Sequence, residues 1–136
     1  MPMIPSPFAA VVYGAVKVVG YAAFAHGLNR FARKPAAPFA FGAVKTVLGL
    51  IGGVTYGLLI VPAIGLADVS DGILFLAAAP VRILAWAVAL GLFYRSRVTP
   101  RVLLTAMALG VVWSYILDGI IWALSSILPG METPWC

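Results

Sequence analysis

Four long apolar segments dominate this sequence, and their length limits what the chain can fold into. They cover residues 7–28, 38–63, 73–94 and 102–128. A helix needs about 20 mostly apolar residues to cross the roughly 30 Å hydrocarbon core of a bilayer, and each segment reaches that length. None of them shows the alternating pattern of a membrane β-barrel strand. We therefore expect an all-α integral membrane protein with four transmembrane helices.

The composition favours the same class. Charged residues make up 10% of the chain, whereas soluble domains contain about 25% because their surfaces face water. With 136 residues the chain has room for at most four or five spans, so we expect residues 1–136 to form a single transmembrane domain. The connectors are short, which favours antiparallel neighbours in an up-down four-helix bundle.

The basic residues predict an orientation in the membrane. Six of the nine Lys and Arg residues lie in the first and third connectors, and these are Arg30, Arg33, Lys34, Arg95, Arg97 and Arg101. The second connector has no basic residue and contains Asp68 and Asp71. Connectors rich in Lys and Arg stay in the cytoplasm. Both termini, including the tail with Glu132, are therefore expected on the non-cytoplasmic side of a plasma or inner membrane.

Three cations and one acid remain inside the apolar segments, namely Lys17, Lys45, Arg82 and Asp118. Lys17 lies deepest, about 15 Å from either end of its segment at a rise of about 1.5 Å per residue. A charge at the bilayer centre costs about 2.5–3.5 kcal/mol even on mild scales, so such residues normally face the bundle interior and indicate a site or pathway. Arg82 and Asp118 lie at compatible depths. A structural pair that fixes helix packing is one interpretation of these two residues.

One carboxylate cannot neutralise three cations. If all four groups are ionised, the excess positive charge predicts an anionic ligand, a lipid phosphate or a carboxylate of a partner protein. Lys45 has an alternative interpretation in which it needs no anion. It lies about 10 Å from the end of its segment, so its long side chain can extend to the membrane surface. We expect the other cations to face the interior.

Helical spacing places polar groups beside these charges. Tyr13 and Tyr21 lie one turn on either side of Lys17, and Ser114 lies one turn before Asp118. A tyrosine can donate to an anion or hold a cation over its ring, but it can equally fill the core. The candidate ligand-binding residues are Lys17, Arg82, Asp118, Tyr13, Tyr21, Ser114 and Lys45.

Three glycines follow Lys45 at spacings of four residues, and these are Gly49, Gly53 and Gly57. They share one helix face, and small residues at this spacing let membrane helices approach closely. A nucleotide-binding loop is not expected here, because no strand precedes these glycines. The pattern predicts a helix-packing face.

Enzymatic and cofactor sites have little support. The single histidine, His26, lies at the basic end of its segment, whereas Asp118 lies towards the opposite end of the fourth segment. They cannot form a hydrolytic triad with Ser114. No cluster of His, Asp and Glu suits a metal, and the single cysteine, Cys136, excludes an intrachain disulfide. The basic residues form no long run, so we expect no nucleic-acid partner. Because no suitable cluster of ligand residues is present in the sequence, we also expect no metal and no cofactor.

The leading hypothesis is a small membrane protein that binds or passes an anionic solute or lipid headgroup through an electropositive intramembrane cavity. We favour a function that is not enzymatic. The alternative is an accessory or assembly subunit of a larger membrane complex, and a third hypothesis is a membrane-embedded enzyme that acts on a lipid. The expected partners are membrane lipids, an anionic ligand and either further copies of the chain or a larger membrane protein.

Overall fold

The computed structural model describes residues 7–65 and 70–127. Asp68, Glu132 and Cys136 lie outside the described residues, as does residue 128 at the end of the fourth predicted segment. The long helices are α1 (Pro7–Leu28), α2 (Pro38–Thr55), α5 (Ala79–Tyr94) and α6 (Pro100–Ile127). Shorter elements are η1 (Asn29–Phe31), the π-helical turn η2 (Tyr56–Ile60), α3 (Val61–Ala63) and α4 (Asp71–Ala77).

The described residues contain helices and no strand. Four helical stretches are long and apolar enough to span a membrane, and these are Pro7–Phe31, Pro38–Ala63, Gly72–Tyr94 and Pro100–Ile127. This confirms the predicted all-α class and the four candidate spans. Three of the long helices begin at a proline, because the fixed φ of proline suits the first helical turn and its missing N–H is not needed there.

The third span is interrupted next to Pro80. Proline has no N–H to donate to the carbonyl of Leu76, and α4 ends at Ala77 while α5 begins at Ala79. Hydroxyl groups of neighbouring helices donate to carbonyl oxygens at the interruption. The Tyr115 hydroxyl lies 3.5 Å from the Leu76 oxygen, and the Tyr56 hydroxyl lies 3.4 Å from the oxygen of Leu74. The interruption lies two residues before Arg82.

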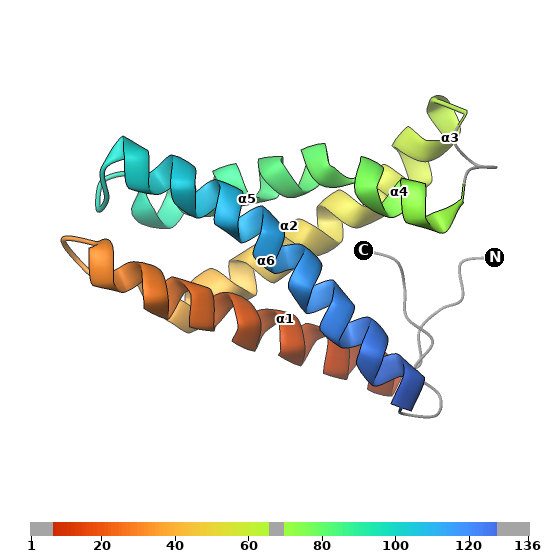
Figure 1. Cartoon of the computed structure of the whole chain (residues 1–136), viewed down its shortest axis with the longest axis horizontal. Coiled ribbons are helices and arrows are strands. Elements are labelled where there is room, and N and C mark those ends of the chain that lie inside the picture. Colours follow the sequence, from red (N-terminus) through yellow and green to blue (C-terminus); the bar gives the residue numbers. More distant parts are fainter. Residues whose placement is uncertain (1–6, 66–69, 128–136) are drawn as a thin grey trace.

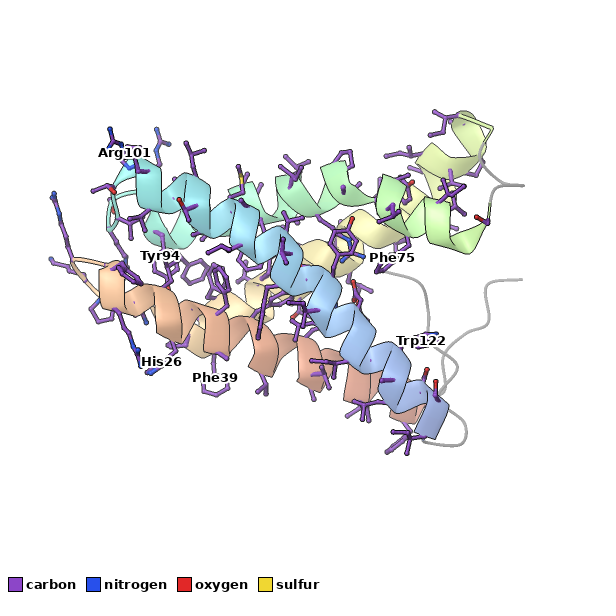
Figure 2. The ribbon with its side chains drawn as sticks, in the orientation of Figure 1. His26, Phe39, Phe75, Tyr94, Arg101 and Trp122 are labelled. Carbon is purple, nitrogen blue, oxygen red and sulfur yellow. The ribbon has the colours of Figure 1, made fainter. Side chains whose placement is uncertain are left out.

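Segments that are neighbours in sequence are also neighbours in space. Helix α1 packs against α2, α2 against α5, and α5 against α6, and α6 returns to α1 (Figure 1). The first and third connectors meet at one end of the bundle. There the Arg97 guanidinium donates to the carbonyl of Pro35 at 2.6 Å, and the backbone N–H of Arg33 donates to the carbonyl of Arg97 at 2.8 Å. We call this the basic end, and Figure 2 labels Arg101 there.

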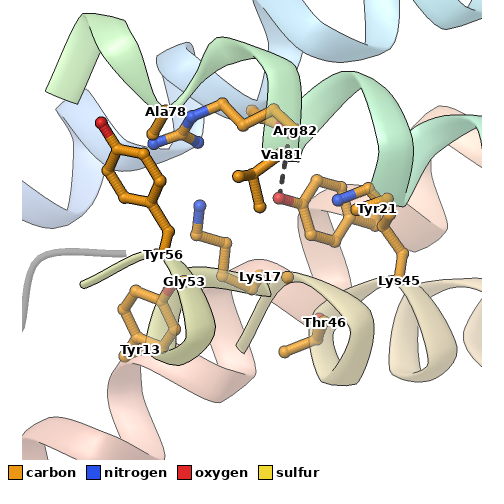
Figure 3. A pocket seen from close by; sticks show the side chains of 13 residues that line it. Tyr13, Lys17, Tyr21, Lys45, Thr46, Gly53, Tyr56, Ala78, Val81 and Arg82 are labelled. Atoms are coloured by element: carbon orange, nitrogen blue, oxygen red, sulfur yellow. Dashed lines mark hydrogen bonds between the residues drawn. The ribbon is translucent and has the colours of Figure 1, made fainter. Parts of the chain in front are cut away.

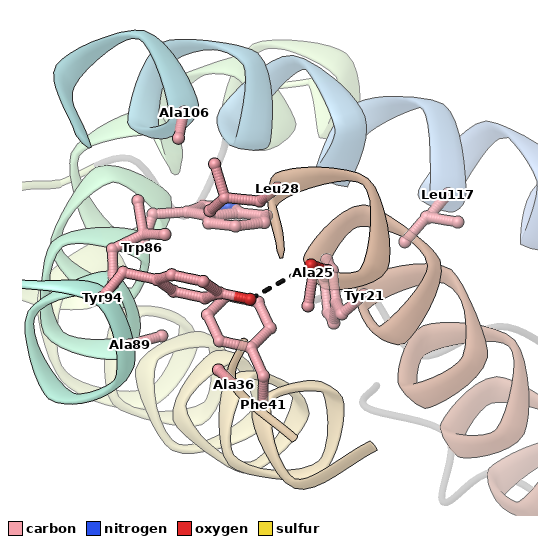
Figure 4. Packing of buried hydrophobic residues seen from close by; sticks show 11 residues of the cluster. Tyr21, Ala25, Leu28, Ala36, Phe41, Trp86, Ala89, Tyr94, Ala106 and Leu117 are labelled. Atoms are coloured by element: carbon pink, nitrogen blue, oxygen red, sulfur yellow. Dashed lines mark hydrogen bonds between the residues drawn. The ribbon is translucent and has the colours of Figure 1, made fainter. Parts of the chain in front are cut away.

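An aromatic core fills the bundle towards the basic end (Figure 4). The fully buried Trp86 ring lies 5.6 Å from the Tyr21 ring and 5.8 Å from the Phe41 ring, measured between centroids. The Tyr94 hydroxyl donates to the Ala25 carbonyl at 3.1 Å. The core therefore draws on α1, α2 and α5, and it lies directly beside the buried charges described below.

Several glycines allow close contacts between elements, and Gly42 and Gly110 are two of them. A Cβ on Gly42 would lie 2.4 Å from the Val18 carbonyl oxygen, so α1 and α2 meet backbone to backbone at this point. A Cβ on Gly110 would lie 2.6 Å from the Trp86 ring. Small residues at such contacts are typical of packed membrane helices.

The predicted packing face on α2 has a different environment. Gly49 and Gly53 line a pocket, and a Cβ on Gly49 would meet only the Lys45 amine, at 3.9 Å. A Cβ on Gly57 would have nothing within 4 Å in the described part of the chain. Gly49 and Gly57 therefore make no close contact with the described part of the chain, and a packing role for Gly49, Gly53 and Gly57 stays a prediction.

Candidate functional site

Asp118 of α6 lies at the centre of the buried charges. Its Oδ1 accepts a hydrogen bond from the Lys17 ammonium of α1, and its Oδ2 accepts one from the Arg82 guanidinium of α5, at 2.5 Å. The side chains of Lys17, Arg82 and Asp118 are each exposed by less than a tenth. One carboxylate therefore links three helices, with each oxygen occupied by a different cation.

Aromatic rings surround both of these cations. The guanidinium carbon of Arg82 lies 5.0 Å from the centroid of Phe75 and 4.4 Å from that of Tyr115. The Lys17 amine lies 5.5 Å from the Tyr13 centroid and 5.7 Å from the Tyr21 centroid. Cations over ring faces are attracted by the electron-rich π system, and the attraction strengthens where water is excluded.

Lys45 of α2 lies in different surroundings. Lys45 is only 2% exposed, and its amine lies 4.7 Å from the centroid of the Tyr21 ring and 5.1 Å from that of the Trp86 ring. Among the side chains that the structure describes, no carboxylate forms an ion pair with Lys45. The interpretation that Lys45 extends to the membrane surface is therefore wrong. Its side chain turns into the bundle, where the Tyr21 and Trp86 rings face its amine.

A small hydrogen-bond network lies where the buried charges meet the aromatic core. The Trp86 N–H donates to Ser114 Oγ at 2.8 Å, and the hydroxyl groups of Ser114 and Tyr21 are hydrogen-bonded at 3.2 Å. Ser114 and Tyr21 are both buried. The network connects α1, α5 and α6 and fixes the Tyr21 ring, which both lysines contact.

A narrow pocket lies among these groups, between α1, α2 and α5 (Figure 3). The side chains of Lys17, Lys45 and Arg82 line it, each from a different helix, and its volume is about 40 Å³. A cavity needs roughly 10–15 Å³ to hold one water molecule on this measure, so the pocket has room for a small ion with only a few water molecules. The remaining lining includes Tyr13, Tyr21, Thr46, Tyr56 and Ser114.

All seven predicted candidates therefore lie together. Lys17, Lys45, Arg82, Tyr13, Tyr21 and Ser114 line the pocket, and Asp118 holds two of the cations in place. His26 is exposed at the basic end, far along α1 from Lys17, and Figure 2 shows it pointing away from the bundle.

The sequence analysis named Tyr13 and Tyr21 beside Lys17, but it missed three other aromatic partners of the cations, Trp86, Phe75 and Tyr115. Trp86 lies four residues after Arg82 and therefore shares a helix face with it, which is a signal that the sequence contains. Phe75 lies seven residues before Arg82, which is also a same-face spacing, whereas Tyr115 lies on a different helix and its contact with Arg82 depends on how α5 and α6 pack.

Comparison with known protein families, with curated proteins and with solved structures finds no match to this chain. Within the described residues, no group of three or more His, Cys, Asp or Glu side chains is placed to hold a metal ion. What the site can bind must therefore be inferred from its own geometry.

Proposed function

We propose that this protein spans a plasma or inner membrane with four helices, and that it binds or passes an anionic solute or the headgroup of an anionic lipid in the pocket between α1, α2 and α5. The observation that carries the proposal is Lys45. It is a buried lysine on the pocket wall with no carboxylate partner among the described side chains, next to two cations that already share one carboxylate.

The charge balance favours an anion as the ligand. The three cations and Asp118 carry a net charge of two when all are ionised, and uncompensated charge inside a membrane protein is costly. An ammonium has three donors, and ring faces satisfy its charge without accepting conventional hydrogen bonds. An anion in the pocket would accept from Lys45 and would also be attracted by Lys17 and Arg82.

Asp118 has a supporting role in this proposal. It orients Arg82 and Lys17 from behind the pocket and keeps the local charge low enough for the ligand-free protein to fold. Both oxygens of Asp118 already accept hydrogen bonds, from Lys17 and Arg82. Lys45 is therefore the cation that a bound anion would stabilise most.

The proposal is tested by melting the purified protein in detergent with chloride, phosphate or sulfate, against gluconate at equal ionic strength to hold screening constant. A short-chain anionic phospholipid, added in a separate arm, distinguishes a lipid headgroup from a free anion. We expect at least one of the soluble anions to raise the Tm of the wild type, and a rise with the lipid counts for this pocket only if Lys45→Met abolishes it.

Lys45→Met should abolish that rise, whereas Lys34→Met should keep it. The control removes the same charge from an exposed lysine in the first connector. If no anion raises the Tm, or if Lys45→Met responds like the wild type, the pocket does not bind an anion.

A subunit role is the second candidate, and the exposure of the second span favours it. Only 6% of the most apolar part of this span is buried within the chain, against 28% for each of the other three spans. A larger membrane partner could cover this face and supply a carboxylate. Co-purification of one such protein at fixed stoichiometry in mild detergent, lost in Lys45→Met, would favour the subunit role over a soluble anion.

A further inference from the structure

A second, larger pocket lies at the basic end, in a groove between α1 and α6. Its volume is about 680 Å³, within the range of ligand sites. Most of its lining is apolar and includes Phe24, Leu28, Phe31, Val102, Leu109 and Trp113. It is separate from the pocket of the proposed function, which lies between α1, α2 and α5.

The groove begins where α1 and α6 separate. From Gly20 and Trp113 towards the start of α1 and the end of α6, the two helices are in contact. The Trp113 N–H donates to the Gly20 carbonyl at 2.9 Å, and a Cβ on Gly20 would lie 2.5 Å from the Leu117 side chain. Ala9 and Ile121 continue this contact. On the other side of Gly20 and Trp113, towards the basic end, the groove occupies the space between the helices.

Two arginines lie at the basic end of the groove. Arg30 and Arg101 both line it, and both are exposed. The first and third connectors contain no Asp or Glu, since the four acidic residues of the chain are Asp68, Asp71, Asp118 and Glu132. The chain therefore supplies no carboxylate from these connectors to neutralise the two guanidinium groups.

The length of the groove corresponds to one membrane leaflet. From Arg101 to Trp113 the lining of α6 extends 12 residues, or roughly 18 Å at a rise of about 1.5 Å per residue. Half of the hydrocarbon core of a bilayer is about 15 Å. Charge at one end and apolar walls over this distance fit a single lipid, with its phosphate at the arginines and an acyl chain along the groove.

We propose that this groove binds one anionic phospholipid. Guanidinium groups form paired hydrogen bonds with phosphate oxygens, and basic pockets between membrane helices are suited to acidic headgroups. The net negative headgroup distinguishes this ligand from a zwitterionic lipid, whose own ammonium would lie close to the arginines.

The test of the charge uses phosphatidylglycerol and phosphatidylcholine with identical acyl chains. Each is added to the protein in detergent, and bound lipid is counted by native mass spectrometry alongside the Tm. We expect one tightly held phosphatidylglycerol and a raised Tm for the wild type. Replacing both groove arginines, R30Q and R101Q together, should reduce retention at least tenfold. The control pair, R33Q with R95Q, removes the same charge from exposed arginines outside the groove lining and should retain the lipid.

The test of the groove itself uses Gly27, which lines it and where an added Cβ would meet nothing within 4 Å among the described residues. Gly27→Leu should exclude the acyl chain without changing any charge, whereas Gly14→Leu, at an equally open glycine of α1, should not. Equal retention of both lipids, or retention unchanged in the R30Q/R101Q or Gly27→Leu protein, would overturn the proposal. So would a dimer that Gly27→Leu dissociates, because a second copy would then occupy the groove.

The proposal for the groove and the proposal for the pocket between α1, α2 and α5 can be refuted independently of each other. Lys45→Met should leave phosphatidylglycerol in the groove, and the R30Q/R101Q protein should keep its response to small anions.

Discussion

Asp118 is shared by two cations, and this sharing decides what each substitution at the buried cluster will cost. Its oxygens hold Lys17 and Arg82 separately, so removing the carboxylate leaves two buried charges, whereas removing one cation leaves a neutral pair. Breaking a buried pair is strongly destabilising because an uncompensated charge stays behind. The three residues are therefore far from equivalent, although they belong to one cluster.

We predict that Asp118→Asn lowers the free energy of unfolding by roughly 3–5 kcal/mol, the usual range for a broken buried ion pair. Lys17→Met should cost much less, because Arg82 keeps its partner and a costly charge is removed. Adding Arg82→Gln to Asp118→Asn should restore part of the loss. Denaturant titration in detergent, followed by circular dichroism, measures these changes. Strictly additive losses in the double variant would show that Arg82 and Asp118 do not interact.

At the scale of the helices, backbone atoms set how closely α1 and α2 can approach each other. Gly42 approaches the Val18 carbonyl oxygen and the Ala22 nitrogen so closely that a Cβ would lie 2.4 Å and 3.1 Å from them. Backbone atoms cannot rotate away as a side chain can, so a larger residue must push the helices apart. Lys17 lies on α1 and Lys45 lies on α2. The distance between the two helices therefore also sets the width of the pocket that both lysines line.

We predict that Gly42→Ala destabilises the protein by about 1–3 kcal/mol, the usual cost of overpacking, despite the higher helix propensity of alanine. Gly14→Ala in α1 is the matched control, since its Cβ would meet nothing within 4 Å. It should be neutral or slightly stabilising. Thermal unfolding of both variants in the same detergent provides the comparison, and equal Tm values for Gly42→Ala and the wild type would contradict the close contact.

At the scale of the whole molecule, charge is distributed very unevenly. Six basic residues lie in the two connectors that meet at one end, while α1 begins and α6 ends at the opposite end (Figure 1). This distribution is the basis for proposing that the basic end faces the cytoplasm. The groove between α1 and α6 opens at the same end, so the proposed lipid would belong to the cytoplasmic leaflet.

Single-cysteine labelling tests this orientation. With Cys136 replaced by serine, Ser70→Cys and Ser96→Cys each introduce one thiol at an exposed position, before α4 and in the third connector respectively. We expect a membrane-impermeant maleimide to label Ser70→Cys in intact cells, and to label Ser96→Cys only after the membrane is permeabilised. The reverse pattern would place the basic end outside and the lipid groove in the other leaflet.

The sequence by itself determined the properties that depend on position along the helices. Apolar length predicted the four candidate spans, and a constant rise per residue placed Arg82 and Asp118 at compatible depths. These properties follow from local covalent geometry and from the distance between residues along one helix.

Only the tertiary structure decided which side chains meet across helices. It showed that Lys17 shares Asp118 with Arg82, that Lys45 turns inward against Tyr21 and Trp86, and that the close glycine contacts on α2 are at Gly42 and Gly52. Each of these depends on the rotation of a helix about its axis and on the separation of its neighbours. Hydropathy does not specify either quantity in a chain that is apolar on nearly all sides, because both are set by the mutual fit of side chains from several helices at once.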